Sequence, residues 1–162
     1  MSVRYMIVIL GAYLLGCSNM AYYLAKGRKA DLTKAGSGNL GASNAVVLLG
    51  WKAGVLTAVH DVGKAALAVL IAGWLLPDLE YAEAASGVAC VLGHIFPFWM
   101  NFAGGKGLAC IGGFLTANPL VLAAFLGRII GVLIALRGIR EAFLCRSLGH
   151  SPFLAGITLG AG

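Results

Sequence analysis

The stretch Gly93–Ala109, GHIFPFWMNFAGGKGLA, joins a histidine at the end of one apolar run to a lysine set among glycines at the start of the next. Gly104, Gly105 and Gly107 carry no Cβ, so the backbone there can approach a ligand closely. Lys106 adds a compact cation with three donors, which suits a phosphate or a carboxylate. The stretch therefore predicts an anion-binding loop. The simpler interpretation, a glycine-rich loop whose lysine marks the cytoplasmic side, stays open.

A P-loop nucleotide site is excluded at this stretch. A Walker A motif needs a glycine five positions before the Gly105–Lys106 pair and a serine or threonine directly after it. Met100 and Leu108 occupy those positions. His94 alone is not diagnostic, since a single histidine near a helix end is more often structural than catalytic.

Composition places the chain in a membrane. The 162 residues are 60% hydrophobic and only 11% charged, and the mean hydropathy is +0.90, which is atypical of soluble domains. Repeated apolar runs predict an all-α, polytopic helical membrane protein with about four transmembrane helices and glycine-rich cytoplasmic loops. We expect no cleaved signal peptide, because no small-residue cleavage site precedes a soluble domain. The net charge of +6 gathers at the ends of apolar runs and requires no nucleic-acid partner.

The four cysteines show neither the spacing of a zinc site nor that of a disulfide framework. We predict that Cys17, Cys90 and Cys110 are small apolar residues within helices. No metal site is predicted.

The first apolar run fixes the orientation. Tyr5–Ala25 has about the 20 residues that a span requires. A basic cluster follows it directly and places the next loop in the cytoplasm; its members are Lys26, Arg28, Lys29 and Lys34. Further spans are expected at Ala84–Met100 and Leu108–Leu126.

The apolar run Val46–Leu76 allows two topologies. Two short spans would place the loops at 35–45 and 104–107 on opposite membrane faces, whereas one long tilted helix would place them on the same face. The turn that holds Asp78, Glu80 and Glu83 has no basic residue, which fits the external side. We therefore expect one helix.

The segment Ala35–Ala45, AGSGNLGASNA, alternates glycines with hydroxyl and amide side chains. It is either a plain turn cluster or the wall of a polar pocket, where backbone N–H groups at the start of a helix bind anions. In the next apolar run, Asp61 and Lys64 are spaced to pair on one helix face. Ionisable residues at membrane depth usually face the bundle interior or a wet cavity.

Together these residues resemble the bacterial integral-membrane acyl-phosphate:glycerol-3-phosphate acyltransferases. The family's first motif resembles Ser37–Asn44, its intramembrane Asp-x-x-Lys resembles Asp61 and Lys64, and its second motif resembles His94–Pro97 followed by Phe102–Gly107. The resemblance covers a predicted acyltransferase-like domain at residues 1–126.

The resemblance implies transfer of a fatty acyl group from acyl phosphate to the 1-hydroxyl of glycerol 3-phosphate, giving lysophosphatidic acid for phospholipid synthesis. It implies catalytic roles for Ser37, Asn39 and His94, with either His94 or the departing phosphate as the base. Asp61 and Lys64 would form a structural or substrate-positioning pair. The residues expected to bind substrate phosphates are Gly38, Gly41, Ser43, Asn44, Gly104, Gly105, Lys106 and Gly107.

The implied partners are acyl phosphate, glycerol 3-phosphate and the lipid bilayer, with no cofactor, no metal and no nucleic acid. The implied location is the bacterial inner (plasma) membrane, which the chain crosses several times with its active-site loops in the cytoplasm.

The sequence departs from the family at two places. Val47 stands where the family has an arginine, and Lys52 lies farther along. The family's third motif, with Asn and Glu, is not found, and residues 127–162 form a divergent tail. Its apolar pieces, Ile129–Leu136 and Phe153–Leu159, are too short to span, and its arginines fall on the external side of the expected topology. We hypothesise a frameshift, a truncation or a gene-model error after Gly127. A small membrane transporter and an inactive acyltransferase remnant are the alternative functions.

Overall fold

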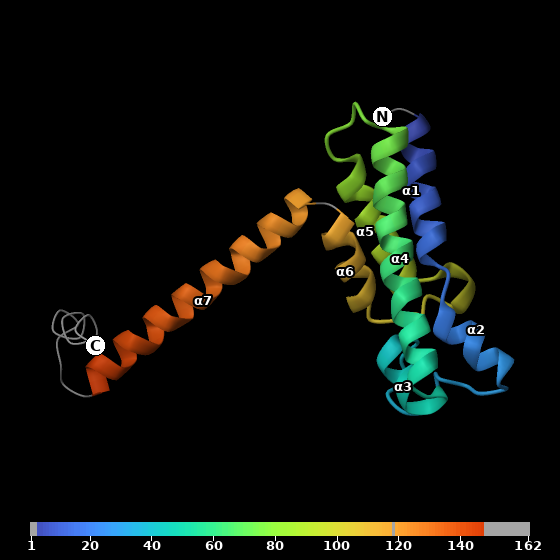
Figure 1. The fold of residues 1–162 in the computed structure, drawn as a ribbon, viewed down its shortest axis with the longest axis horizontal. Coiled ribbons are helices and arrows are strands. Elements are labelled where there is room, and N and C mark those ends of the chain that lie inside the picture. Colours follow the sequence, from blue (N-terminus) through green and yellow to red (C-terminus); the bar gives the residue numbers. More distant parts are fainter. Residues whose placement is uncertain (1–2, 118, 148–162) are drawn as a thin grey trace. The chain divides into compact units, whose positions relative to one another are not determined.

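The computed structural model describes residues 3–117 and 119–147 and divides into two units, Met1–Val121 and Leu122–Gly162. The described residues are helices joined by loops, with no strand among them. The helices are α1 (Val3–Gly16), α2 (Met20–Gly27), α3 (Ala42–Leu49), α4 (Trp51–Leu75), α5 (Ala82–Ile95), the 3-10 turn η1 (Phe98–Met100), α6 (Leu108–Ala117) and α7 (Pro119–Ser147). Figure 1 shows their order along the chain.

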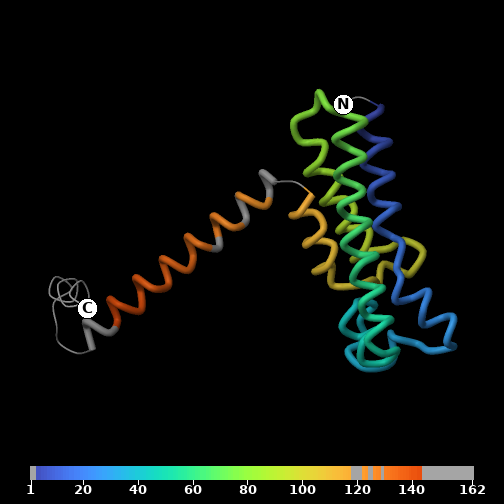
Figure 2. The backbone as a smooth tube through the Cα atoms, viewed as in Figure 1, coloured from blue at the N-terminus to red at the C-terminus, as the bar shows by residue number. Residues whose placement is uncertain are grey.

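Helix α4 is the centre of the first unit. It packs against α1, α3, α5 and α6, and α1 also packs along α5 (Figure 2). Small side chains allow this close packing, because Ala65, Ala68 and Ala72 of α4 are all buried. A Cβ on Gly93 of α5 would collide with the Tyr13 carbonyl of α1.

Two predicted helices are interrupted. The expected span Tyr5–Ala25 consists of α1 and α2, which are separated by the turn at Cys17. The prediction of one long helix in Val46–Leu76 is confirmed by the 25-residue α4. The predicted start at Val46 is wrong, because α4 begins at Trp51. Gly50 has a φ of 88°, a left-handed conformation that ends α3 before α4 begins.

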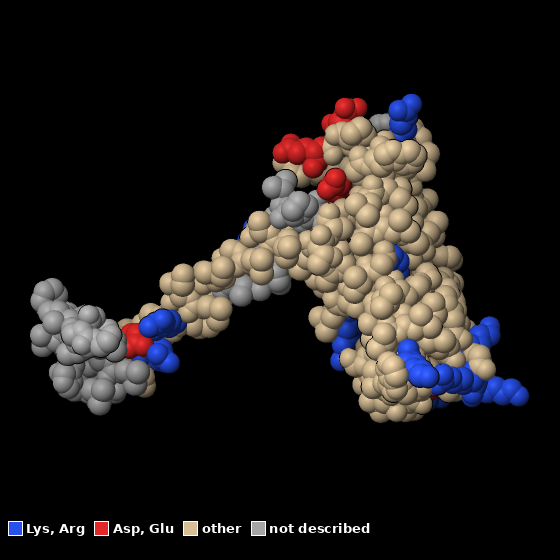
Figure 3. All heavy atoms as spheres, viewed as in Figure 1, with Lys and Arg blue, Asp and Glu red and all other residues tan. Residues whose placement is uncertain are grey.

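Two helical segments are long and apolar enough to cross a membrane among the described residues: Val3–Gly27 and Trp51–Leu75, each of 25 residues. The other expected spans are shorter, because α5 has 14 residues and α6 has 10. Figure 3 shows a broad uncharged surface on the first unit. The acidic atoms lie at the end that holds the N-terminus, where some basic atoms are also present, and most of the basic atoms lie at the opposite end. This arrangement is that of an all-α membrane protein.

Helix α7 begins at the end of the first unit, provides the helix of the second, and continues without a break through 29 residues. The prediction that Ile129–Leu136 is a short, separate apolar piece is therefore wrong, because these residues are part of a long helix. Pro119 also begins this helix instead of lying inside the preceding one, because proline fits the first turn, where its missing N–H has no acceptor. The expected piece Phe153–Leu159 lies outside the described residues.

The predicted roles of the cysteines are mostly confirmed. Cys17, Cys90 and Cys110 are buried free thiols. Cys90 and Cys110 lie in α5 and α6, whereas Cys17 lies just after α1.

Candidate functional site

The loop before α3 is fastened by a buried amide. Asn44 Oδ1 accepts a hydrogen bond from the Ser37 N–H at 3.0 Å, and Asn44 Nδ2 donates to the carbonyls of Leu32 at 3.1 Å and Ala35 at 3.2 Å. The Asn44 side chain is only 2% exposed. Asn44 thus holds the loop in shape, and it does not line the cavity described below.

The second glycine loop folds back onto the end of α5. The N–H groups of Gly104 and Gly105 donate to the carbonyls of Ile95 at 3.0 Å and His94 at 3.1 Å. A Cβ on Gly104 would collide with the His94 carbonyl, and one on Gly105 would collide with His94 Nε2. The backbone at these two glycines therefore lies close to α5, and not to a ligand as expected. Their N–H groups are already bonded and are not available to a ligand.

A cavity of about 330 Å³ lies between the two loops. The first loop and the start of α3 contribute Ser37, Asn39, Gly41, Ala42 and Ser43. The second loop and the start of α6 contribute Lys106, Gly107, Leu108 and Ala109, and two buried helix residues, Asp61 and His94, complete the lining. The two loops therefore lie at the same end of the bundle, as the single long helix predicts.

Two helix N-termini meet at this cavity. In α3 the first N–H with a helical acceptor is that of Ala45, which donates to Gly41 at 3.1 Å, and no side chain caps this helix. In α6 the corresponding first bond is from Ile111 to Gly107 at 2.8 Å. The N–H groups before these bonds have no helical acceptor, and each helix dipole adds partial positive charge at this end. The cavity is therefore suited to an anion.

The polar side chains that the two loops and the start of α3 contribute to the lining are unengaged among the described residues. Within the described part of the chain, Lys106 has no ion pair or hydrogen bond, and it is exposed. The same range shows no side-chain hydrogen bond for Ser37, Asn39 or Ser43, although all three line the cavity. These groups can therefore contact a ligand without breaking an existing bond.

Beneath the cavity lies a buried network centred on Lys64. Its Nζ lies 3.0 Å from Asp61 Oδ1 and 2.9 Å from His94 Nδ1. It also donates to the carbonyls of Gly16 at 3.0 Å and Ser18 at 2.5 Å. The predicted Asp61–Lys64 pair is thus present, with both side chains at most 3% exposed. Four acceptors surround the three N–H groups of this ammonium, and these contacts compensate for the loss of water.

His60 was not among the expected site residues, yet it joins this network. Its Nδ1 lies 3.3 Å from Asp61 Oδ1, and its Nε2 lies 3.1 Å from the Ser18 hydroxyl. The only sequence signal was its position next to Asp61, and that is too common to be diagnostic.

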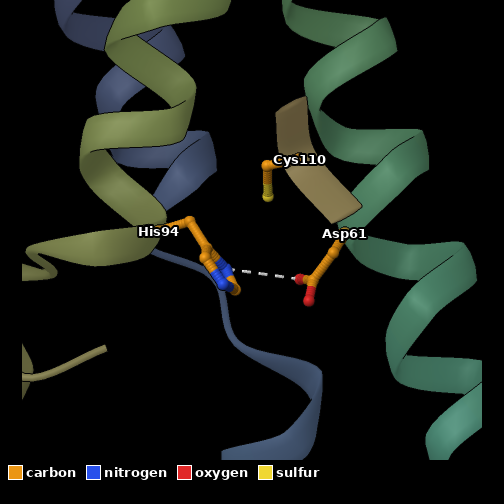
Figure 4. Close-up of side chains that lie close together, drawn as sticks. All are labelled: Asp61, His94 and Cys110. Atoms are coloured by element: carbon orange, nitrogen blue, oxygen red, sulfur yellow. Dashed lines mark ion pairs between the residues drawn. The ribbon is translucent and has the colours of Figure 1, made fainter. Parts of the chain in front are cut away.

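Asp61, His94 and Cys110 point toward one another from α4, α5 and α6 (Figure 4). Their ligand atoms lie within 4.8 Å of one another, a grouping that could hold a metal ion. The Lys64 ammonium, however, already contacts both Asp61 and His94, and it would repel a second cation at that distance. The donor set therefore does not favour a metal.

Val47, which stands where the family has an arginine, contributes nothing to the cavity. Val47 is 74% exposed and does not line the cavity. Lys52 does not replace the arginine either, since it is absent from the lining and its Nζ lies 5.9 Å from the Trp51 ring.

Comparisons with known proteins identify the family. The family model described as "Glycerol-3-phosphate acyltransferase" matches residues 6–157, which reaches beyond Gly127 into the expected tail. A glycerol-3-phosphate acyltransferase of Geotalea daltonii is 37% identical over 153 residues, which are 93% of this chain and 77% of the relative. One from Pseudomonas aeruginosa is 45% identical over 118 residues, which are 70% of this chain and 61% of the relative.

The structural comparison also finds a glycerol 3-phosphate acyltransferase. The crystal structure of PlsY, an integral membrane glycerol 3-phosphate acyltransferase, in its glycerol 3-phosphate form has a TM-score of 0.66 and 36% identity. It covers 75% of this chain and 62% of that protein. The lysophosphatidic acid form has a TM-score of 0.64 and 35% identity, covering 75% of this chain and 61% of the other. Three of these four matches thus span less than two thirds of the relative's length.

Proposed function

Since the chain belongs to the glycerol-3-phosphate acyltransferase family, we propose that it transfers a fatty acyl group from acyl phosphate to the 1-hydroxyl of glycerol 3-phosphate. The observation that carries the proposal is the convergence of two helix N-termini and Lys106 on one cavity. Both substrates carry a phosphate, and such a site favours anions. The product is lysophosphatidic acid, released together with inorganic phosphate.

The reaction needs no covalent enzyme intermediate, because an acyl phosphate is already activated. The 1-hydroxyl oxygen attacks the acyl carbonyl carbon, the bond from that carbon to the phosphate oxygen breaks, and phosphate leaves. The hydroxyl proton passes to the departing phosphate or to His94. The protein must hold two phosphates side by side and stabilise the negative charge that develops on the carbonyl oxygen. Lys106 and the N–H groups at the start of α3 and α6 would serve both needs.

The unengaged side chains of the lining would orient the substrates. Ser37, Asn39 and Ser43 line the cavity and offer hydroxyl and amide groups to the glycerol hydroxyls and to phosphate oxygens. Gly41 and Gly107 line it with backbone alone, so that a phosphate can approach the helix starts closely. The remaining expected site glycines, at 38, 104 and 105, would shape the loops around it.

The location is part of the same proposal. We propose that the end of the bundle with the two glycine loops faces the cytoplasm of a bacterial inner membrane, where the water-soluble glycerol 3-phosphate is available. The basic cluster Lys26–Lys34 lies in the loop next to this end, which agrees with the positive-inside rule. The acyl chain of the donor would stay in the bilayer.

An inactive relative is the second candidate, and Val47 favours it. The exposed Val47 cannot supply the charge of the family's arginine. The aberrant-tail hypothesis for residues 127–162 belongs to this candidate. Translation of the coding DNA beyond the Gly127 codon in the other two frames tests it: further long apolar spans with an Asn/Glu-bearing motif support the hypothesis, and their absence from both frames refutes it.

The experiment that tests the proposed donor compares three acyl donors on the purified protein. Acyl phosphate, acyl-CoA and acyl carrier protein thioester of the same chain length are each supplied with glycerol 3-phosphate. Acyl phosphate alone should support lysophosphatidic acid formation. Turnover of a thioester without turnover of acyl phosphate would overturn the assigned donor.

A further inference from the structure

The δ1 nitrogen of His94 faces an ammonium group. Lys64 Nζ lies 2.9 Å from it, which is hydrogen-bond distance, and both side chains are buried. An ammonium carries three N–H donors and no lone pair, so it can only donate. His94 Nδ1 must therefore be the acceptor, with its lone pair directed at Lys64.

A proton on His94 Nδ1 would be in conflict with this contact. Two N–H groups would point at each other at 2.9 Å, and in a protonated imidazole two positive charges would do so without water between them. Asp61 Oδ1 lies 3.5 Å from the same nitrogen, farther than Lys64 does. Asp61 and His94 Nδ1 are therefore two acceptors that share one cation, and the dashed contact in Figure 4 joins these acceptors.

His60 has the opposite arrangement around the same carboxylate. Its Nδ1 lies 3.3 Å from Asp61 Oδ1, and an ionised carboxylate only accepts, so His60 Nδ1 carries the proton. The Ser18 hydroxyl then donates to His60 Nε2 at 3.1 Å. The two histidines of the network are therefore opposite tautomers.

The remaining ring nitrogen of His94, Nε2, lies next to the second loop. His94 is a lining residue, and its Nε2 lies against the Cα of Gly105 in the second loop. A neutral imidazole with an unprotonated Nδ1 has its proton on Nε2. Toward a substrate it offers an N–H group, whereas a general base would need a lone pair there.

We propose that Lys64 is a positioning residue that fixes His94 as the neutral Nε2–H tautomer, so that His94 serves the reaction as a hydrogen-bond donor and not as its base. The proton of the attacking hydroxyl then leaves with the departing phosphate. The acceptor would be an oxygen of the acyl phosphate, where negative charge increases during attack. This role rests on the proposed acyl transfer, whereas the tautomer itself does not. The two can therefore be tested separately.

The tautomer is measured by nitrogen NMR of the full chain labelled with 15N-histidine in detergent micelles. The His94 signals are identified by their loss in His94→Gln, and those of His60 by their loss in His60→Gln. In the wild type, His94 should show a protonated ε2 and a bare δ1 nitrogen, and His60 the reverse in the same spectrum. A His94 protonated on δ1, or on both nitrogens, overturns the proposal whether or not the chain is active.

The Lys64→Met variant tests the cause. Without the ammonium, the His94 δ1 nitrogen faces Asp61 and should become the protonated one, so that the tautomer switches. Lys64→Arg retains a donor and should retain the wild-type tautomer. An unchanged His94 spectrum in a folded Lys64→Met variant would show that Lys64 does not set the tautomer. If Lys64→Met fails to fold, the wild-type and Lys64→Arg spectra still decide the assignment.

The catalytic role is tested by replacing the ring with an amide. Glutamine can place an N–H group near the position of Nε2 but cannot accept a proton at neutral pH. His94→Gln should keep kcat within about tenfold of the wild type, whereas His94→Ala should lose about 10²-fold, the usual cost of one transition-state donor. Equal losses in the two variants would contradict the donor role. Wild-type inactivity would refute the proposed function and leave the tautomer measurement valid.

Discussion

The Cα of Gly105 lies so close to the His94 ring that a methyl group at position 105 would overlap Nε2. The packing of the second loop on α5 thus requires a glycine at position 105. The position of the loop and the position of the His94 ring therefore depend on each other. This contact places the two halves of the second sequence motif, His94 and the lysine loop, against one another.

We expect Gly105→Ala to displace either His94 or the loop and to lower kcat/KM by roughly 10²-fold, because small misplacements at a reacting centre have effects of this size. Gly112→Ala in α6 is the matched control, since a Cβ there meets nothing within 4 Å. The control should keep its activity and unfold at the same or a higher temperature, since alanine favours helix over glycine by about 1 kcal/mol. Equal activity of the two variants would contradict the packing argument.

Lys106→Ala should raise the KM for glycerol 3-phosphate by roughly tenfold or more, which corresponds to about 1.4 kcal/mol of lost binding. The reason is that Lys106 lines the cavity and has no partner within the described range that could hold its charge elsewhere. Lys52→Ala removes the same charge from a side chain that does not line the cavity. Steady-state kinetics of both variants check this, and a similar KM in both would remove Lys106 from the site.

Asn44→Ala should destabilise the protein, on the order of 1–3 kcal/mol, because it leaves buried loop groups without hydrogen-bond partners. Asn44 makes all three of its bonds within the loop and none to the cavity. Thermal unfolding in micelles measures the effect. Ser43→Ala is the control for stability, because no side-chain bond of Ser43 is lost within the described residues. An Asn44→Ala variant as stable as the wild type, with only KM changed, would instead favour the ligand role expected from the motif.

Single cysteines introduced in a background without native cysteines should report the topology. Ala35→Cys and Ala103→Cys lie in the two glycine loops, Glu80→Cys lies in the acidic turn, and all three positions are exposed. A membrane-impermeant maleimide added to intact cells should label only position 80, and all three should react after lysis. Labelling of one glycine loop without the other would contradict a shared cavity.

Much of the site could be predicted from sequence because its elements are local. The pairing of Asp61 with Lys64 follows from helical spacing alone. The convergence of the two loops required only the choice of one long helix, which the acidic turn favoured. Charge at the ends of apolar runs thus carried long-range information in this membrane protein.

The remaining features depend on packing that no local pattern encodes. Gly104 and Gly105 looked like ligand-binding glycines, yet they pack on α5, because a missing Cβ serves either kind of close contact. His94 looked like a base, and only the three-dimensional position of Lys64 shows which nitrogen is engaged. Asn44 stands within the motif but faces the loop interior, since neighbouring positions on a short helix point in different directions.

The most direct test of the proposed function supplies membranes that contain this protein with radiolabelled glycerol 3-phosphate and acyl phosphate. The site described here predicts labelled lysophosphatidic acid in proportion to the amount of protein, and a loss of most of that product with Lys106→Ala but not with Lys52→Ala. Absence of lysophosphatidic acid from folded, membrane-inserted wild-type protein would contradict the proposed acyl transfer and favour the inactive relative.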